Sequence, residues 1–238
     1  MAFNDGVTIS IENGIHIIKF NNPKQKNALN LNVYQSIAKS LEDAAKNPNV
    51  LVTVFTGEGE YYTSGNAIPK SLDRPEEILN ESLEAVRAFV AALIDYPKLL
   101  VAVVNGPAIG IGVTTLGLCD IVYASSKATF QTPFSKLALC AEACSSYTFP
   151  RILGKSKACE VLYVNHKMTA EEAEKYGLVS KVYEHSELHT VWNKIAEFTD
   201  LSLESILISK QMSKKFDIAK LHEANNMEIE NLKIFKEH

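Results

Sequence analysis

One carboxylate in the sequence has neighbours that favour proton transfer. Glu142 is flanked by apolar or small residues, namely Leu137, Ala138, Leu139, Cys140, Ala141, Ala143 and Cys144. Such surroundings desolvate a carboxylate, which raises its pKa and suits it to act as a base towards a weakly acidic carbon. A lone glutamate is more commonly a solvated surface residue, so the hypothesis that Glu142 is a general base needs further support.

Two glycine-containing loops could stabilise the negative charge that such a base creates. Residues 105–112 read Asn-Gly-Pro-Ala-Ile-Gly-Ile-Gly after an apolar run, and residues 62–66 read Tyr-Thr-Ser-Gly-Asn. Glycines between a strand and a helix leave N–H groups unpaired and allow a ligand to approach the main chain closely. Either loop alone is explained by a tight turn. The two loops together with Glu142 predict an anion-stabilising site.

The glycine loop does not match a nucleotide-binding motif. A dinucleotide fingerprint that begins at Gly110 requires glycine where the sequence has Thr115. The tripeptide Gly154-Lys155-Ser156 resembles the end of a phosphate-binding loop, but the first glycine of that motif would have to be Phe149. We therefore expect no nucleotide cofactor at either place.

The cysteines and histidines show no pattern for a disulfide framework or a metal site. Cys119, Cys140, Cys144 and Cys159 have no paired CxxC spacing, and the six histidines include no HExxH motif. A thiol nucleophile at Cys140 or Cys144 is an alternative, but no histidine lies nearby in sequence to activate it. We predict reduced, mostly buried thiols and no metal.

The composition indicates a globular protein with a sizeable core. The chain has 238 residues, 46% of them hydrophobic, and a formal net charge of -4. This charge argues against a nucleic-acid partner, because such a protein needs a basic face for the phosphates. Residues 99–118 are uncharged and long enough to span a bilayer, but their proline and glycines favour a buried strand, loop and helix. No membrane span is expected.

Hydrophobic patterning predicts alternating strands and helices around these loops. Residues 7–11 and 15–20 flank Asn13-Gly14, which predicts a hairpin with a type I′ turn. Thr169 and Glu172 predict a capping box at the start of a helix. Further strands are expected at 51–56, 99–104, 121–124, 129–131 and 178–183, and helices at 34–44, 85–94, 155–164 and 170–176. The alternation indicates an α/β architecture with a helical tail from His189 onwards.

Three segments resemble the landmark motifs of the crotonase, or enoyl-CoA hydratase/isomerase, superfamily. They are GEGEYYTSGNAI, KLLVAVVNGPAIGIGVTTLGLCDIVYAS and FQTPFSKLALCAEACSSYTFPRILG. The resemblance runs from about Val7 to the end of the chain and is closest to the Δ3,Δ2-enoyl-CoA isomerase branch, since SSYTFP and the SGN triplet are typical of it. It implies a crotonase-like spiral of βαβ units over residues 1–190, a helical C-terminal region over residues 191–238, and a homotrimer.

The resemblance also assigns roles to residues of the two loops. It places the backbone N–H groups of Asn66 and Ile111 in an oxyanion hole for the carbonyl of an acyl-CoA thioester, and it makes Glu142 the catalytic glutamate. The substrate-binding positions carried over from the family are Lys24, Lys26, Asn27, Ala28, Ser64, Gly65, Asn66, Ala67, Ile68, Gly110 and Ile111. For Lys24 and Lys26, a solvated surface is an equally good interpretation.

Two further positions select the reaction. The hydratase glutamates correspond to Thr114 and Phe134, neither of which can take a proton from water. The resemblance therefore implies isomerisation of 3-enoyl-CoA to trans-2-enoyl-CoA in the β-oxidation of unsaturated fatty acids, without a cofactor. The usual Pro-Glu-Gly of the branch is Ala141-Glu142-Ala143 here. A non-catalytic acyl-CoA-binding or scaffold module, or another CoA-ester enzyme, is therefore the alternative.

The family implies a peroxisomal or mitochondrial location. No targeting signal is visible, since no apolar leader follows Met1 and the chain ends Phe235-Lys236-Glu237-His238 rather than in a Ser-Lys-Leu type signal. Family members commonly extend further, so a truncated C-terminus is one interpretation of this ending.

Overall fold

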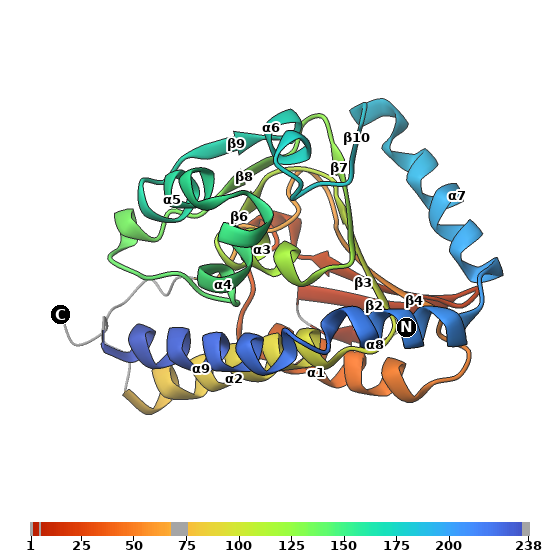
Figure 1. Cartoon of the computed structure of the whole chain (residues 1–238), viewed down its shortest axis with the longest axis horizontal. Helices are drawn as coiled ribbons and strands as arrows, with labels where there is room; N and C mark the ends of the chain where they lie inside the picture. Colours follow the sequence, from red (N-terminus) through yellow and green to blue (C-terminus); the bar gives the residue numbers. More distant parts are fainter. Residues whose placement is uncertain (1, 5, 68–75, 235–238) are drawn as a thin grey trace.

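The computed structural model describes residues 2–4, 6–67 and 76–234, and its largest element is a seven-stranded sheet (Figure 1). The strand order is β1-β2-β3-β4-β5-β7-β10, with antiparallel pairing among the first three strands and parallel pairing from β3 to β10. The bounds are Ala2–Asn4, Gly6–Glu12, Ile15–Asn21, Val52–Gly57, Leu99–Val104, Ile121–Ser125 and Lys181–Tyr183. Parallel neighbours require long crossover connections, and these connections carry the site.

A second, smaller sheet lies among short helices at the top left of Figure 1. Its strands are β6 (Ala108–Ile109), β8 (Thr129–Gln131) and β9 (Lys167–Thr169), and β8 lies in the middle. The helices around it are α3 (Ile111–Thr114), α4 (Ser145–Ile152), α5 (Lys155–Tyr163) and α6 (Ala170–Lys175). β6 belongs to the glycine loop, so this sheet supports that loop.

The long helices run below the large sheet in Figure 1. They are α1 (Leu31–Lys46), α2 (Glu76–Asp95), α8 (Leu203–Lys214) and α9 (Ile218–Ile234). Apolar side chains of α1 and α2, such as Ile37, Leu41 and Leu93, are at most 1% exposed and belong to the main core. Burial of such a side chain contributes about 1.5–3 kcal/mol.

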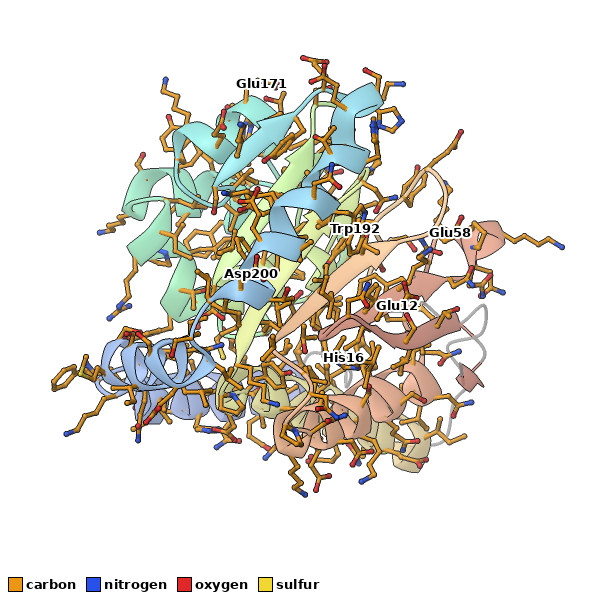
Figure 2. The ribbon with its side chains drawn as sticks, turned by 90° about the vertical axis from the view of Figure 1, so that its right-hand side faces the viewer. Glu12, His16, Glu58, Glu171, Trp192 and Asp200 are labelled. Carbon is orange, nitrogen blue, oxygen red and sulfur yellow. The ribbon has the colours of Figure 1, made fainter. Side chains whose placement is uncertain are left out.

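Helix α7 (Val191–Ala196) covers the other face of the sheet. Its Val191 and Ile195 are fully buried in a second core cluster with Val54 and Val103 of the central strands. Figure 2 shows Trp192 of the same helix in front of the sheet. Short 3-10 helices complete the chain at Pro23–Gln25, Thr115–Leu118, Ser135–Leu137, His185–Thr190 and Glu197–Asp200.

Much of the predicted secondary structure is confirmed. The hairpin turn has positive φ at Asn13 (49°) and Gly14 (80°), and Thr169 and Glu172 form the capping box of α6. Residues 99–118 form β5, β6, α3 and a 3-10 helix, and within the described ranges no helix is long and apolar enough to cross a membrane. The α/β class with a helical C-terminal region is confirmed, whereas the domain division at residue 190 stays a prediction.

One predicted boundary is wrong, and one helix was not predicted. The strand expected at 178–183 begins only at Lys181, because the N–H groups of Leu178 and Val179 both bond Ala173 O and close the end of α6. Helix α4 was not predicted, since it contains Pro150, a residue that normally ends a helix.

Candidate active site

The two glycine loops lie side by side. Ile109 N donates a hydrogen bond to Thr63 O at 3.0 Å, in a parallel bridge between the loops. Gly65 packs against the same segment so closely that a Cβ atom would lie 2.6 Å from Ile109 O, and its φ of +81° also favours glycine. The pairing brings Asn66 and Ile111, each one or two residues beyond this contact, to neighbouring positions.

Among the described residues, nothing accepts a hydrogen bond from the backbone N–H groups of Asn66 and Ile111. In the bridge between Leu29 and Asn66, the hydrogen bonds run from Leu29 N to Gly65 O and from Ala67 N to Leu29 O, which leaves the N–H of Asn66 on the other side. Ile111 is the first residue of α3, so its N–H has no acceptor within the helix. Within the described part of the chain, neither N–H has a hydrogen-bond partner.

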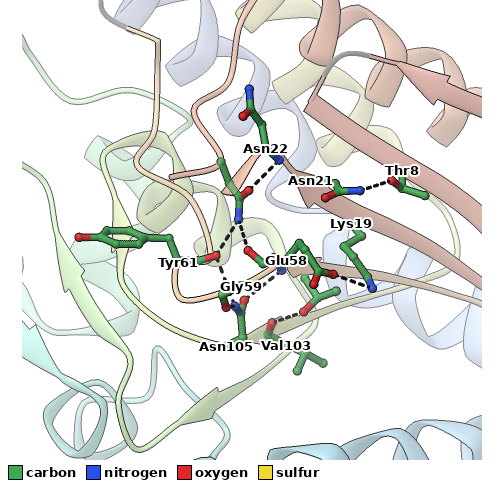
Figure 3. A network of polar contacts seen from close by, with 12 residues as sticks. Thr8, Lys19, Asn21, Asn22, Glu58, Gly59, Tyr61, Val103 and Asn105 are labelled. Atoms are coloured by element: carbon green, nitrogen blue, oxygen red, sulfur yellow. Dashed lines mark hydrogen bonds and ion pairs between the residues drawn. The ribbon is translucent and has the colours of Figure 1, made fainter. Parts of the chain in front are cut away.

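Two amide side chains, a partly exposed one at Asn105 and a buried one at Asn27, hold the base of these loops. Asn105 Nδ2 donates to Gly59 O at 2.8 Å (Figure 3). Asn27 is only 1% exposed, and its Nδ2 donates to Glu58 O at 2.9 Å and to Tyr61 O at 2.8 Å. The carboxamide of Asn27 is therefore committed to the loop backbone. Its N–H donates to Asn22 O at 2.9 Å and its carbonyl accepts from Thr63 Oγ1 at 2.6 Å, so its predicted substrate-binding role stays a prediction.

The other predicted substrate-binding residues lie along the same loops. Ser64 N donates to Lys26 O at 2.8 Å, which joins the segment of Lys26 to the Asn66 loop. The side chains of Lys24 and Lys26 are exposed, and Lys26 Nζ lies 5.1 Å from the ring centroid of Tyr61. Ala28, Ala67 and Gly110 are at least partly exposed. Ile68 lies outside the described residues.

The structure joins Glu142 to the Asn66 loop. Glu142 is 5% exposed, and Asn66 Nδ2 lies 3.2 Å from both of its carboxylate oxygens. Tyr34 OH in turn donates to Asn66 Oδ1, which fixes the orientation of the amide. Burial, and then the charge of Glu142, raise the pKa of Tyr34 well above its usual range, so the hydroxyl keeps its proton and remains a donor.

The surroundings of Glu142 differ in part from the prediction. Ala143 and Cys144 are buried beside it, as expected. Leu137 is 46% exposed and Ala138 is also exposed, so these two do not desolvate the carboxylate. They belong to a 3-10 turn and its left-handed end, which point this part of the segment towards solvent.

The backbone directly after Glu142 is left-handed. Ala143 has φ of +54° and Cys144 has φ of +61°. This conformation costs a residue with a side chain about 1–2 kcal/mol, so the alanine that replaces the family's glycine stands where glycine would be favoured. The turn is closed by a hydrogen bond from Ser145 N to Glu142 O at 3.2 Å. The fold must supply other contacts that stabilise this turn.

Comparison with known proteins identifies the family. The model of the enoyl-CoA hydratase/isomerase family matches residues 10–238. The chain belongs to this family. A rat protein named enoyl-CoA delta isomerase 2 is 46% identical over 96% of this chain and 59% of its own length. Mouse peroxisomal enoyl-CoA delta isomerase 3 is 44% identical over 92% of this chain and 70% of its own length.

A solved structure of the same family shares the fold. The crystal structure of an enoyl-CoA hydratase from Mycobacterium avium subsp. paratuberculosis K-10 superimposes with a TM-score of 0.92 at 26% identity, covering 100% of this chain and 96% of that chain. This likeness confirms the crotonase-like spiral. The chain spans somewhat less than two thirds of the two delta isomerase 2 relatives, from rat and human, at 59% and 57% of their lengths.

The resemblance assigns the glutamates of the family's hydratases to Thr114 and Phe134. The structure places no carboxylate at either position. Thr114 is fully buried, and its Oγ1 donates to Ile111 O at 3.4 Å. Phe134 is 3% exposed and packs in the main core. Glu142 therefore has no second carboxylate beside it at either place.

The cysteines near Glu142 are poorly suited to nucleophilic chemistry. Burial raises the pKa of Cys140 to about 11 and raises the pKa of Cys144 still further, so both thiols stay protonated at neutral pH. The expectation of mostly buried thiols agrees with the structure, in which Cys144 is buried and the other three cysteines are partly buried. Cys159, for example, lies in an open surface groove along α5.

No metal cluster is found among the described residues, counting groups of three or more His, Cys, Asp or Glu. One pair of histidines, His185 and His189, does have the four-residue spacing that a metal site on a helix can use. Here His185 Nδ1 lies 2.9 Å from Ser125 Oγ, and His189 Nδ1 lies 3.0 Å from Ser186 O. These nitrogens are therefore engaged with other groups of the protein.

Proposed function

We propose that this chain shifts the double bond of a 3-enoyl-CoA to give the trans-2-enoyl-CoA, in the β-oxidation of unsaturated fatty acids. The observation that carries the proposal is the buried carboxylate of Glu142, held by Asn66 beside two backbone N–H groups that have no hydrogen-bond partner among the described residues. The names of the rat and mouse relatives, both enoyl-CoA delta isomerases, support the same reaction.

The proposed reaction begins at the thioester. Its oxygen accepts hydrogen bonds from the N–H groups of Asn66 and Ile111, which stabilise the charge that develops when a C2 proton leaves. One such donor is worth about 3 kcal/mol in the transition state. Glu142 takes the proton, and the electron pair of the C2–H bond enters a dienolate.

The second half of the reaction uses the same carboxyl group. Protonated Glu142 donates its proton to C4, and the electron pair returns from the enolate oxygen to restore the thioester carbonyl. The double bond then lies between C2 and C3. Atoms and charge balance without another reactant, so we propose that no cofactor takes part. The Asn66 amide, which donates to both carboxylate oxygens, stabilises ionised Glu142 between turnovers.

We further propose a homotrimer that works in the peroxisome or the mitochondrion. The family resemblance supports the assembly, and exposed apolar side chains at Ile208, Met212 and Phe216 offer surface that an interface could cover. The mouse relative is named peroxisomal, which supports the first of the two locations. Light scattering of the purified protein should give three chain masses.

The function is tested with the wild-type protein and two substrates. We expect a 3-enoyl-CoA to be converted to the 2-enoyl-CoA, and a 2-enoyl-CoA to remain unhydrated under the same conditions. Hydration of the second substrate would contradict the proposal. Binding of acyl-CoA without any turnover of the first substrate would favour the scaffold alternative.

A further inference from the structure

A second buried carboxylate contacts the segment that carries Glu142. Glu228, on helix α9, is 3% exposed. Its Oε2 accepts a hydrogen bond from Cys144 N at 2.6 Å, and its Oε1 accepts one from Ser146 N at 3.0 Å. The donor atoms belong to the left-handed turn after Glu142 and to the first turn of α4. The Glu228 side chain thus accepts hydrogen bonds from the backbone at both ends of this turn.

The chemistry of these contacts suits the turn. The first N–H groups of a helix have no partner within it, and a carboxylate there satisfies them and interacts favourably with the helix dipole. Burial raises the pKa of Glu228, whereas the backbone donors of Ser146 and Cys144 favour its ionised form. The backbone N–H groups of the turn therefore stabilise the ionised Glu228 carboxylate, and the carboxylate in return stabilises the turn.

Helix α9 is also held by contacts that do not involve Glu228. Its Leu221, Ile229 and Leu232 are buried in the main core. On the α2 side, Arg87 and Glu230 form an ion pair at 2.5 Å. These contacts attach the helix to the core. The two hydrogen bonds that the Glu228 carboxylate accepts from the turn are therefore additional to them.

We propose that Glu228 is a positioning residue for the catalytic carboxylate. It holds Ala143 and Cys144 in the left-handed conformation that a glycine at position 143 would adopt more easily, and so fixes the place of Glu142. This inference rests on the proposed function of Glu142. It also explains how a chain without that glycine can keep the carboxylate beside Asn66.

The test compares variants of Glu228 in the full-length protein. Glu228→Gln keeps the shape and loses the charge, whereas Glu228→Asp keeps the charge and shortens the reach. Glu223→Gln is the matched control, since Glu223 is an exposed carboxylate on the same helix. Each variant is measured for kcat and KM with a 3-enoyl-CoA and for amide hydrogen exchange over residues 140–148.

We expect both Glu228 variants to lower kcat about tenfold or more, with KM changed less than about threefold, and to speed exchange over residues 140–148. Adding Ala143→Gly to Glu228→Gln should recover part of the lost kcat, a rescue that a purely structural role would not produce. Unchanged exchange and kcat in both variants, or the absence of rescue, would overturn the proposal. The exchange comparison needs no turnover, so an inactive wild type would count against the isomerase function alone.

Discussion

The two glycine loops, which carry the N–H groups of Asn66 and Ile111, and the segment around Glu142 are held in place in different ways. Around the loops, backbone hydrogen bonds and close glycine contacts do most of the work, and a Cβ at Gly106 would lie only 1.9 Å from Glu60 O. Around Glu142, side chains from remote parts of the chain hold the turn: Glu228 contacts Cys144 across 84 residues of sequence. A substitution in the loops should therefore cause a large loss of activity. A substitution among the side chains that hold the Glu142 segment should cause a smaller one.

The difference follows from what each part must do. An oxyanion is stabilised by donors that do not move, so a rigid backbone frame suits the N–H groups. A carboxylate that takes a proton from C2 and gives it to C4 must instead be oriented towards both carbon atoms. Contacts with other side chains can set this orientation. Substitutions on the two sides should separate these roles.

Among substitutions that leave Glu142 itself in place, the largest effect is expected at the close contact between the loops. Gly65→Ala would place a Cβ 2.6 Å from Ile109 O at a position with φ of +81°. We expect kcat/KM to fall about a hundredfold, because the Asn66 N–H is displaced. The free energy of unfolding should also fall. The fall should be about 2 kcal/mol larger than the backbone strain of an alanine with positive φ would cause by itself.

Gly154→Ala is the matched control for this strain. Gly154 also has positive φ, at +76°, but an added Cβ would meet nothing within 4 Å. Chemical denaturation should show a loss of about 1–3 kcal/mol for this variant, with kcat unchanged. Equal losses of stability and activity in both variants would mean that the loop contact does not matter.

A smaller effect is expected on the carboxylate side. Tyr34→Phe removes the hydroxyl that donates to Asn66 Oδ1, so the amide can rotate away from Glu142. We expect kcat to fall about tenfold, the equivalent of one hydrogen bond, with little change in KM. Tyr96→Phe removes another buried hydroxyl, one that bonds Thr53. Loss of activity in Tyr96→Phe as large as in Tyr34→Phe would contradict a specific role for Tyr34.

The smallest effect on turnover is expected at His16, which lies away from both parts of the site, between the sheet and α1 (Figure 2). Burial, aided by the charge of Lys98, lowers the pKa of His16 from 6.5 to about 4. The unfolded chain therefore binds a proton between these pH values while the folded chain does not, so stability falls as pH falls through this window. The loss should reach about 3 kcal/mol at pH 4.

The His16 prediction is checked by denaturation at several pH values. His16→Gln should lose less stability than the wild type between pH 7 and pH 4, while kcat at neutral pH stays the same. His189→Gln, which removes an exposed histidine, should follow the wild type. A wild-type curve that matches that of His16→Gln would rule out this histidine as the source of the pH dependence.

The parts that sequence could predict are those encoded by neighbouring residues. The Asn13-Gly14 turn and the Thr169–Glu172 capping box depend on residues a few positions apart, and both are present. The two glycine loops could be found for the same reason, and the structure places them together.

Contacts between distant segments could not be predicted in this way. Nothing in the sequence around Tyr34 or Glu228 indicates that one fixes the Asn66 amide and the other the turn at Cys144. The replacement of glycine by Ala143 was visible, but the left-handed backbone that makes it important was not. That conformation is stabilised by tertiary contacts, so only the folded chain reveals it.

The central claim is that Glu142 is the base, and the most direct measurement is the isomerisation rate of Glu142→Gln at saturating 3-enoyl-CoA. Glutamine keeps the shape and can still accept a hydrogen bond from Asn66, but it cannot take a proton. We predict a fall in kcat of about a thousandfold or more, with unchanged affinity for a saturated acyl-CoA. The exposed Glu171→Gln should match the wild type. A rate for Glu142→Gln within tenfold of the wild type would contradict the assignment.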